Sequence, residues 1–422
     1  MLKKIPTRQL RLGMHLHALE GAWIDHPFWK TRFVIRDPDD LRRVRESQVL
    51  ECWIDPSKGL DVADETPAVR PRAPAPAANS APSGAAAEAA AAARGPAPPA
   101  PPRAPMQEEL RAAAAVCGRA RGKVRSMFKE ARLGHAVDAQ DCLPLVDEIA
   151  ESVMRHPGAL VSLARLKTAD EYSYMHSVAV CALMVALGRQ LGLDDGQCRS
   201  AGLAGLMHDL GKAAIPLEIL NKPGRLSEAE FAIVKEHPQR GHEMLVEGRG
   251  AGPELLDVCL HHHERMDGKG YPHGLAGEAI SLAARMGAIC DVYDAVTSNR
   301  PYKAGWDPAE SIARMASWKG HFDSTLFAAF VRSLGIYPTG SLVRLESGRL
   351  AVVVEQNPNV LTAPVVKVFF STRSNLPIPA QHLDLAVNTT DRIVGRESPT
   401  QWGFTFLDEL WADPELLRQR RA

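Results

Sequence analysis

Imidazole and carboxylate groups are concentrated in one part of this chain. Eight of its fifteen histidines fall between residues 176 and 273, and Asp residues lie among and after them in otherwise apolar stretches. Neutral imidazole and carboxylate are ligands that proteins offer to Fe, Mn, Ni, Co and Zn, and thiolates are not needed to complete such a set. We therefore predict a metal centre. Its candidate ligands are His176, His208, Asp209, His237, His262, His263 and Asp291.

Two of these candidates are adjacent in the segment "LMHDLGK". Neighbouring helical residues point about 100° apart, so an ion at a helix end can take both His208 and Asp209. The carboxylate is then free to bridge a second ion. Two ions roughly 3.5 to 4 Å apart activate a water and clamp phosphate oxygens. The pattern predicts phosphoester hydrolysis by a metal-bridged hydroxide, with Asp209 and Lys212 as catalytic residues, because Lys212 can reach charge developing on a phosphate.

Residues on either side of the last ligand offer contacts for a substrate. The glycines of "DGKGYP", including Gly270, permit close approach to the backbone, and Tyr271 offers a ring and a hydroxyl. Asp294 lies in "AICDVYDAV", and Arg300 and Lys303 in "RPYK" add cations. We predict these five residues and the catalytic lysine as substrate-binding residues.

Each of these features alone has an ordinary structural explanation. A His-Asp pair is more often a structural hydrogen-bonded pair, the run "HHHE" can be a solvated helix end, and "RPYK" can be a surface patch. The metal hypothesis depends on five widely spaced segments that all place ligand types on apolar helices. The histidines not expected to bind metal are His242, His261 and His273.

Several helices must position these ligands, because one helix offers a neighbour only three or four residues away. Apolar residues at helical spacing predict helices over 107–128, 142–156, 174–192, 199–215, 227–245, 253–264, 282–298 and 307–318. Two of these carry start signals, Ser227 followed by Glu230, and Asp307 before Pro308. An all-α bundle is therefore expected to hold the metal centre.

Composition divides the rest of the chain. Residues 1–65 mix aromatic and β-branched runs with Gly, Asp and Pro, which predicts a small α+β regulatory or docking domain. In residues 66–105, Ala and Pro supply 28 of 40 residues, which predicts a disordered linker. Residues 106–337 are expected to form the helical domain. Two or more strands are expected in a β appendage and tail, 338–422. The predicted fold class is mainly α.

Charge and cysteine content narrow the function classes. Lys plus Arg and Asp plus Glu both total 50, so no overall field recruits a nucleic-acid polymer or anionic lipid. The seven cysteines form no C-x-x-C pair, which is typical of reduced thiols. Neither a signal-peptide core nor a run of 18 apolar residues is present in the sequence. We expect a cytoplasmic protein without membrane insertion.

The chain resembles the HD-GYP domain, a variant of the HD phosphohydrolases that hydrolyses cyclic di-GMP in bacteria. The resemblance covers about residues 140–335 and rests on "YMHS", "HDLGK", "HPQRGHEML", "HHHERMDGKGYP" and "DVYDAVTSNRPYK", in this order. It implies an HD-type helical bundle and a cyclic-di-GMP phosphodiesterase. "GMHL", "GAWIDHPF" and "WIDPSKG" resemble an uncharacterised domain often found before HD-GYP domains, and this second resemblance implies no function.

The resemblance also implies residue roles. The six candidate ligands from His208 to Asp291 match the family's metal ligands, and His176 matches an additional one. Lys212 matches its catalytic-site lysine. The residues that match its substrate contacts are Tyr271, Arg300 and Lys303.

One position departs from the family pattern. Members with three metals have a glutamate four residues before the first histidine, where this chain has Tyr172, and Glu171 is rotated by about 100° on a helix. We therefore expect two divalent ions, Fe or Mn before Ni, Co or Zn. Two ions suffice for the cut to linear pGpG, and conversion to GMP is expected to be slower or absent.

Three functional hypotheses follow. The chain is a cyclic-di-GMP phosphodiesterase, a catalytically weak cyclic-di-GMP sensor or adaptor, or an HD phosphohydrolase for another nucleotide. The complete ligand set with Lys212 favours the enzyme. Expected partners are cyclic di-GMP, a diguanylate cyclase or other signalling protein, and a second copy of the chain in a homodimer.

Overall fold

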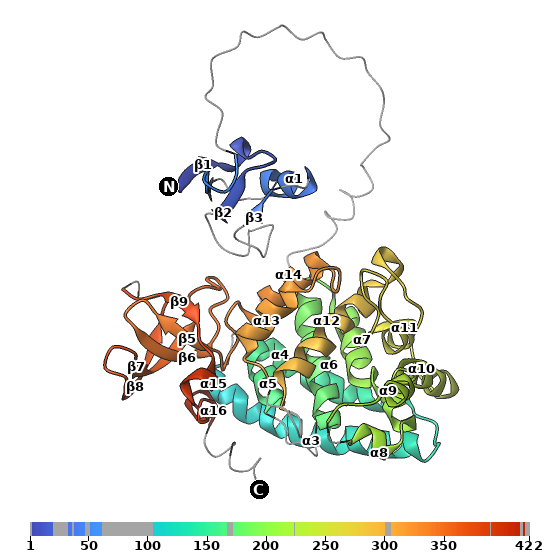
Figure 1. Ribbon diagram of the computed structural model, residues 1–422. Coiled ribbons are helices and arrows are strands. Elements are labelled where there is room, and N and C mark those ends of the chain that lie inside the picture. Colours follow the sequence, from blue (N-terminus) through green and yellow to red (C-terminus); the bar gives the residue numbers. More distant parts are fainter. Residues whose placement is uncertain are drawn as a thin grey trace, which may run out of the picture. The chain divides into compact units, whose positions relative to one another are not determined.

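The computed structural model describes residues 2–19, 33–35, 38–46, 51–60, 104–166, 172–222, 224–299, 305–388, 390–413 and 417. The chain divides into two compact units, Met1–Ala100 and Pro101–Ala422 (Figure 1). The predicted linker lies outside the described residues as far as residue 103. Within the described residues, no helix has the length and apolar character that crossing a bilayer requires.

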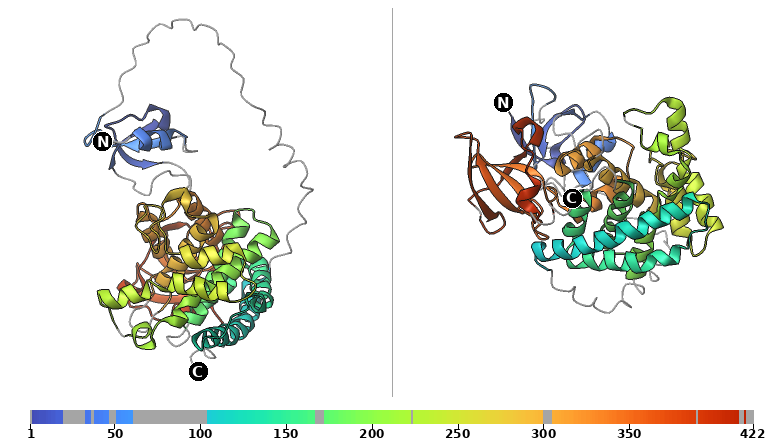
Figure 2. Two further views of the ribbon diagram at one scale, coloured as in Figure 1. Left: turned by 90° about the vertical axis from the view of Figure 1, so that its right-hand side faces the viewer. Right: turned by 90° about the horizontal axis from the view of Figure 1, so that it is seen from below.

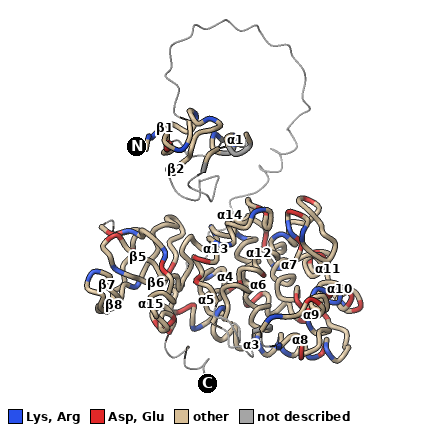
Figure 3. The backbone as a smooth tube through the Cα atoms, viewed as in Figure 1, with Lys and Arg blue, Asp and Glu red and all other residues tan. Residues whose placement is uncertain are grey.

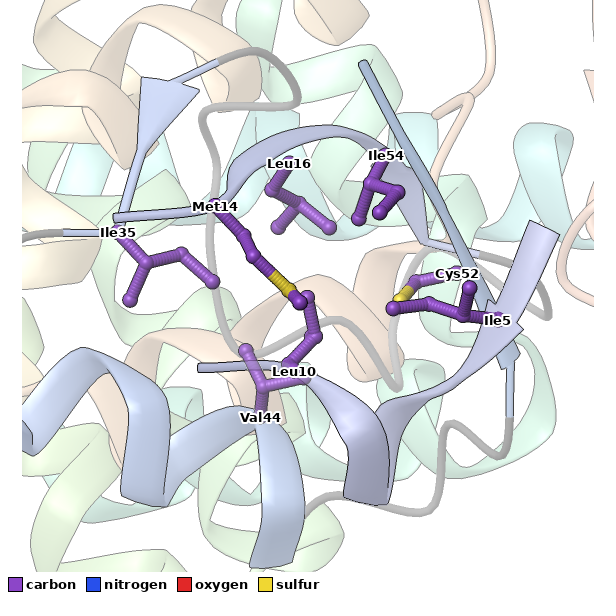
Figure 4. Close-up of a cluster of buried hydrophobic side chains, with 8 residues drawn as sticks. All are labelled: Ile5, Leu10, Met14, Leu16, Ile35, Val44, Cys52 and Ile54. Carbon is purple, nitrogen blue, oxygen red and sulfur yellow. The ribbon is translucent and has the colours of Figure 1, made fainter. Parts of the chain in front are cut away.

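The first unit is a small antiparallel sheet with one helix. Its strands β1 (Lys3–Pro6), β2 (His15–Leu19), β3 (Phe33–Val34) and β4 (Glu51–Ile54) are ordered β1-β4-β2-β3. The 3₁₀ turn η1 (Thr7–Gln9) and helix α1 (Pro38–Glu46) complete it, which confirms the predicted α+β composition. Its core consists of Ile5, Leu10, Met14, Leu16, Ile35, Val44, Cys52 and Ile54 (Figure 4).

The second unit is built around one central helix, α6 (Tyr172–Gln190). Its residues 175–188 are all buried, because apolar side chains surround the helix and every face needs a partner. The partners are α3 (Met106–Arg132), α4 (Leu143–Arg155), α5 (Pro157–Arg165), α7 (Asp195–Met207), α12 (Leu282–Thr297) and α14 (Ser324–Leu334). The long helix α3 lies along one side of the bundle (Figure 2).

The structure interrupts two of the predicted helices. The segment 199–215 is helical only to Met207 and continues, after His208 and Asp209, as the 3₁₀ turn η4 (Leu210–Ala214). The segment 227–245 divides into α9 (Glu228–Val234) and α10 (His237–Glu247). Pro238 lies in the first turn of α10. Because proline has no amide hydrogen, it cannot donate the backbone hydrogen bond that would continue α9 into α10. The prediction of single helices was therefore wrong at both places.

The remaining helical elements are η3 (Ala139–Cys142), α8 (Leu217–Leu220), α11 (Pro253–His261), η5 (Gly277–Ala279) and α13 (Pro308–Ser317). Both predicted start signals are confirmed. Ser227 and Glu230 form a reciprocal capping box at α9, and the Asp307 side chain accepts from two amides at the start of α13. The sequence had not predicted α5 and α14.

A five-stranded antiparallel sheet follows the helices. Its strands β5 (Leu342–Leu345), β6 (Arg349–Glu355), β7 (Val365–Ser371), β8 (Leu376–Asp384) and β9 (Ile393–Arg396) are ordered β8-β7-β6-β5-β9. Short helices α15 (Pro399–Trp402) and α16 (Asp408–Trp411) follow it. The predicted β content near the C-terminus is thus confirmed, as is the mainly α fold class.

The sheet packs on the helical bundle through specific hydrogen bonds. The Leu342 amide of β5 donates to Asp307 Oδ2 (3.1 Å), and the Arg396 guanidinium of β9 donates to the Ala309 carbonyl oxygen of α13 (3.0 Å). Basic and acidic residues are interspersed along the described elements (Figure 3).

Candidate metal centre

Five elements bring the seven predicted ligands together. His176 lies on α6, His208 and Asp209 follow α7, His237 begins α10, His262 and His263 follow α11, and Asp291 lies on α12. All are buried except His263, which is partly exposed. Imidazole and carboxylate groups far apart in the sequence therefore share one buried region.

Asp209 lies at the centre of this cluster. Its Oδ1 is 3.3 Å from His237 Nε2 and 3.8 Å from His262 Nε2. Its Oδ2 is 3.4 Å from His208 Nε2 and 3.5 Å from His176 Nε2. The backbone here has φ −98° and ψ 9°, in the bridge region where many active-site residues lie. The end of α7 therefore turns this carboxylate toward four imidazoles.

Asp291 closes the other side of the cluster. Its Oδ1 is 3.0 Å from His176 Nε2 and 3.8 Å from His208 Nε2, and its Oδ2 is 3.7 Å from His263 Nδ1. In three overlapping groups, the potential donor atoms lie within 4.8 Å of one another. These groups are His176, His208 and Asp291; His208, Asp209 and His262; and His237, His262 and His263.

Most of the imidazoles are oriented by a hydrogen bond at Nδ1. In His208 and His237, Nδ1 donates to the carbonyl oxygen three residues earlier (2.8 and 2.7 Å). His262 Nδ1 lies 3.0 Å from the carbonyl oxygens of Val258 and Cys259. His176 Nδ1 lies 2.6 Å from Asp294 Oδ2. Partners of this kind fix the tautomer and present the Nε2 lone pair to a metal.

Asp294 was predicted as a substrate-binding residue, and the structure places it behind His176. The carboxylate is buried and also accepts from the Ser298 hydroxyl (3.1 Å). This position is suited to orienting the His176 ring. The sequence did not distinguish this position from the site itself, because both Asp residues of "DVYDAV" are on the same helix.

Electrostatics separate the members of the cluster. Burial lowers the pKa of His262 well below its usual range and that of His263 to about 3. Burial also opposes ionisation of Asp209, but Lys212 and His208 outweigh it and hold that pKa well below its usual range. Burial lowers the pKa of His208, but Asp209 and Asp291 outweigh it and raise the pKa to about 10. Asp209 is thus ionised and the rings of His262 and His263 are neutral, while His208 carries a proton that a metal ion would displace.

The donor set fits a divalent metal ion. His208 Nε2 and Asp209 Oδ1 are buried without a hydrogen-bond partner, which is costly unless another species satisfies them. The ionised Asp209 and the neutral rings of His262 and His263 are already in the protonation states that metal ligands need, whereas His208 must lose a proton when a metal binds. Two acids among five imidazoles therefore form a cluster of the kind that binds divalent cations.

Lys212 and Tyr271 border the cluster. Lys212 Nζ lies 2.5 Å from Asp209 Oδ2, and its side chain is 21% exposed. The Tyr271 ring stacks on His263, with centroids 4.7 Å apart, and burial raises the pKa of its hydroxyl. At Gly270, a Cβ would lie 2.4 Å from Glu264 Cα, so the loop requires glycine there.

The remaining residues considered in the sequence either lie outside the part of the chain that the structure describes or belong to no donor group. Arg300, Lys303, Glu171 and the Tyr172 side chain lie outside the described residues. The three histidines that were not expected to bind metal belong to none of the donor groups found among the described residues. They are His242, His261 and His273. His261 Nε2 lies 3.0 Å from His273 Nδ1.

Sequence reasoning missed a contact that positions two ligands. Gly211 of η4 lies against α10, where an added Cβ would be 1.9 Å from the His237 carbonyl oxygen and 2.4 Å from the Gly241 amide nitrogen. Glycine therefore lets the turn after Asp209 approach the helix that begins at His237. The available signals were the glycines of "HDLGK" and "HPQRGH".

Comparisons with known proteins give two family matches and several relatives. Residues 145–326 match a family described as "HD domain", and residues 2–142 match one described as "Domain of unknown function (DUF3391)". A cyclic di-GMP phosphodiesterase of Pseudomonas aeruginosa is 56% identical over 421 residues, which covers 97% of this chain and 96% of that protein.

Two further relatives match less than half of the chain. A cyclic di-GMP phosphodiesterase response regulator of Xanthomonas campestris pv. campestris is 40% identical over 182 residues, 40% of this chain and 47% of that protein. A 3'3'-cGAMP-specific phosphodiesterase 1 of Vibrio cholerae is 38% identical over 168 residues, 39% of this chain and 38% of that protein. Of these three relatives, the Pseudomonas protein is similar over nearly the whole chain.

Proposed function

We propose that this chain, which belongs to the HD-GYP family of HD phosphohydrolases, is a metal-dependent phosphodiesterase that hydrolyses cyclic di-GMP to linear pGpG. The convergence of three overlapping donor groups on Asp209 and Asp291 carries the proposal. The Pseudomonas relative, similar over nearly the whole length, is named for this substrate. A chain that conserved only the fold would not need this donor set.

Two divalent ions would be held by the cluster, Fe or Mn before Ni, Co or Zn. His176, His208 and Asp291 are one donor group, and His237, His262 and His263 are another. Asp209 lies between the two groups. Divalent ions supply Lewis acidity, which acidifies water and neutralises phosphate charge.

The chain's own residues would orient the substrate and hold charge. Lys212 keeps an ammonium at the partly exposed edge of the cluster, where a phosphodiester can approach it. The Tyr271 ring covers His263 and limits water at that side. Gly270 and Tyr271, together with Arg300 and Lys303, are proposed substrate contacts. Asp294 is proposed to act through the His176 ring, which it orients.

The test is product identification after anaerobic loading with metal. Metal-loaded protein is expected to convert cyclic di-GMP to pGpG, with GMP appearing slowly or not at all, and chelation is expected to stop the reaction. Asp209→Ala is expected to lower kcat/KM by more than about 10³-fold, since it removes a group shared by four imidazoles. Binding of cyclic di-GMP without any linear product would instead indicate a sensor or adaptor.

Another cyclic dinucleotide is the second candidate substrate. A relative that is 38% identical is named for 3'3'-cGAMP, so one catalytic centre in this family is associated with different bases. Parallel assays with 3'3'-cGAMP distinguish the two. A higher kcat/KM for 3'3'-cGAMP than for cyclic di-GMP would identify 3'3'-cGAMP as the preferred substrate, and the proposed phosphodiester hydrolysis would be unchanged.

The terminal regions are proposed to regulate or position the enzyme. We assign residues 1–65 to a regulatory or docking domain, 66–105 to a linker, 106–337 to the HD-GYP domain and 338–422 to a β appendage and tail. All seven cysteines are buried and none belongs to a disulfide, which supports action in the reducing cytoplasm. A diguanylate cyclase, another signalling protein or a second copy of the chain are the proposed protein partners.

A further inference from the structure

A lysine outside the predicted site lies beside the tyrosine that covers the metal centre. Lys235 directly follows α9 and is partly buried. Its Nζ lies 5.2 Å from the centroid of the Phe231 ring and 5.9 Å from that of Tyr271. These distances are within the range of cation–π attraction, which holds the ammonium between two aromatic side chains.

This ammonium has no carboxylate partner among the described residues. Nearby charges are paired with one another: Lys222 Nζ lies 2.7 Å from Glu230 Oε2, and Glu236 Oε2 lies 3.6 Å from Arg240 Nη2. Keeping a partly buried cation without an anion costs free energy. An arrangement of this kind is suited to an anion that arrives with a ligand.

The position of Lys235 relative to the metal centre indicates which anion that is. Tyr271 stacks on His263, so Lys235 is separated from the donor cluster by the thickness of a ring stack. Lys212, in contrast, lies directly against Asp209 at the edge of the cluster. The chain therefore places one ammonium in contact with a candidate ligand and a second one farther out, behind Tyr271.

A cyclic dinucleotide carries two phosphodiester groups, and only one of them is attacked in a turnover. The metal cluster and Lys212 face the group that reacts. The other group keeps its negative charge and needs a donor at the rim of the site. An ammonium without a protein anion satisfies that need better than one that is already paired.

We propose that Lys235, held in place by Phe231, binds the phosphodiester of the cyclic dinucleotide that is not being hydrolysed. This inference rests on the proposed function and adds a specificity residue to the same site. Lys235 would favour doubly charged cyclic dinucleotides over phosphodiesters with a single charge. Phe231 is a positioning residue in this arrangement, because it contacts the lysine and not the substrate.

The experiment compares two substrates with metal-loaded full-length protein. One is cyclic di-GMP, and the other is bis(p-nitrophenyl) phosphate, which has one phosphodiester. Lys235→Met is expected to raise KM for cyclic di-GMP about tenfold, with kcat changed less than about twofold. Both constants for bis(p-nitrophenyl) phosphate are expected to stay within about twofold. Lys235→Arg is expected to restore most of the affinity, since it keeps the charge.

Two further variants separate binding from local structure. Lys222→Met is the matched control, because it removes a lysine near α9 whose charge is already paired with Glu230. It is expected to leave both substrates unchanged. Phe231→Leu is expected to raise KM for cyclic di-GMP by about threefold, and to add nothing in the Lys235→Met background.

The outcomes distinguish this inference from the function on which it rests. Wild-type protein that hydrolyses bis(p-nitrophenyl) phosphate but neither binds nor cleaves cyclic di-GMP would overturn both. Normal cleavage of cyclic di-GMP with an unchanged KM in Lys235→Met would overturn the role of Lys235 alone. Equal losses with both substrates, or a loss in Lys222→Met of the same size, would indicate a structural effect and also overturn that role.

Discussion

Adding Mn²⁺ to metal-free protein between about pH 7 and pH 8.5 is expected to displace about one proton from His208. Burial lowers the pKa of this imidazole, but Asp209 and Asp291 outweigh it and raise the pKa to about 10. The ring is therefore charged throughout this window. A metal ion binds the lone pair of the His208 ring nitrogen and must therefore displace the proton that occupies it. His263, whose pKa burial lowers to about 3, is already neutral and releases none.

The size of the effect follows from the pKa of His208. Below a pKa of about 10, each step of one pH unit downward is expected to weaken the apparent association constant about tenfold. Binding at pH 7 is then about 500-fold weaker than at pH 10, where half of the rings are still protonated, a difference of about 4 kcal/mol. The affinity thus rises with pH, because the competing proton is lost.

Isothermal titration in buffers of different ionisation enthalpy measures the released protons, and His208→Asn is the control. Other groups, including water, can also lose protons, so the difference between the two proteins is the decisive quantity. We expect wild-type protein to release about one proton more per molecule than the variant. A difference near zero, or a wild-type affinity that does not change over this pH range, would refute the assigned charge of His208.

Three substitutions test other parts of the structure. Asp294→Asn is expected to weaken metal affinity and turnover by about 10- to 100-fold, measured by metal titration and kcat/KM, because it loosens the support of a ligand ring. Gly211→Ala forces a Cβ to within 1.9 Å of the His237 carbonyl oxygen, and is expected to lower the free energy of unfolding by about 1 to 3 kcal/mol in urea and to weaken metal binding. Glu109→Gln removes the charge of the buried Glu109, which pairs with the partly exposed Arg155. It is expected to lower the free energy of unfolding in urea by about 1 to 2 kcal/mol and to leave metal affinity unchanged.

Local signals in the sequence were sufficient for much of the fold. The spacing of apolar residues located most of the helices. Ser227 and Asp307 were predicted to begin helices, and in the structure they are the N-caps of α9 and α13. These features depend on residues three or four positions apart, so a linear sequence contains them. The helix breaks after Met207 and before His237 were both missed. The second break had a local signal in Pro238, whereas the turn after Met207 packs against α10 at Gly211, a tertiary contact that no local pattern shows.

The sequence by itself determined which side chains can bind metal and which kind of chemistry they favour. Residue types and motif order are sufficient for that, because imidazole and carboxylate keep their ligand chemistry wherever they lie. Only the tertiary structure decided which atoms face one another. It placed Asp294 behind His176, left His208 Nε2 without a partner, and brought Lys235 next to Tyr271. Such contacts join residues from 36 to 118 positions apart, and packing between helices sets them, which no local pattern encodes.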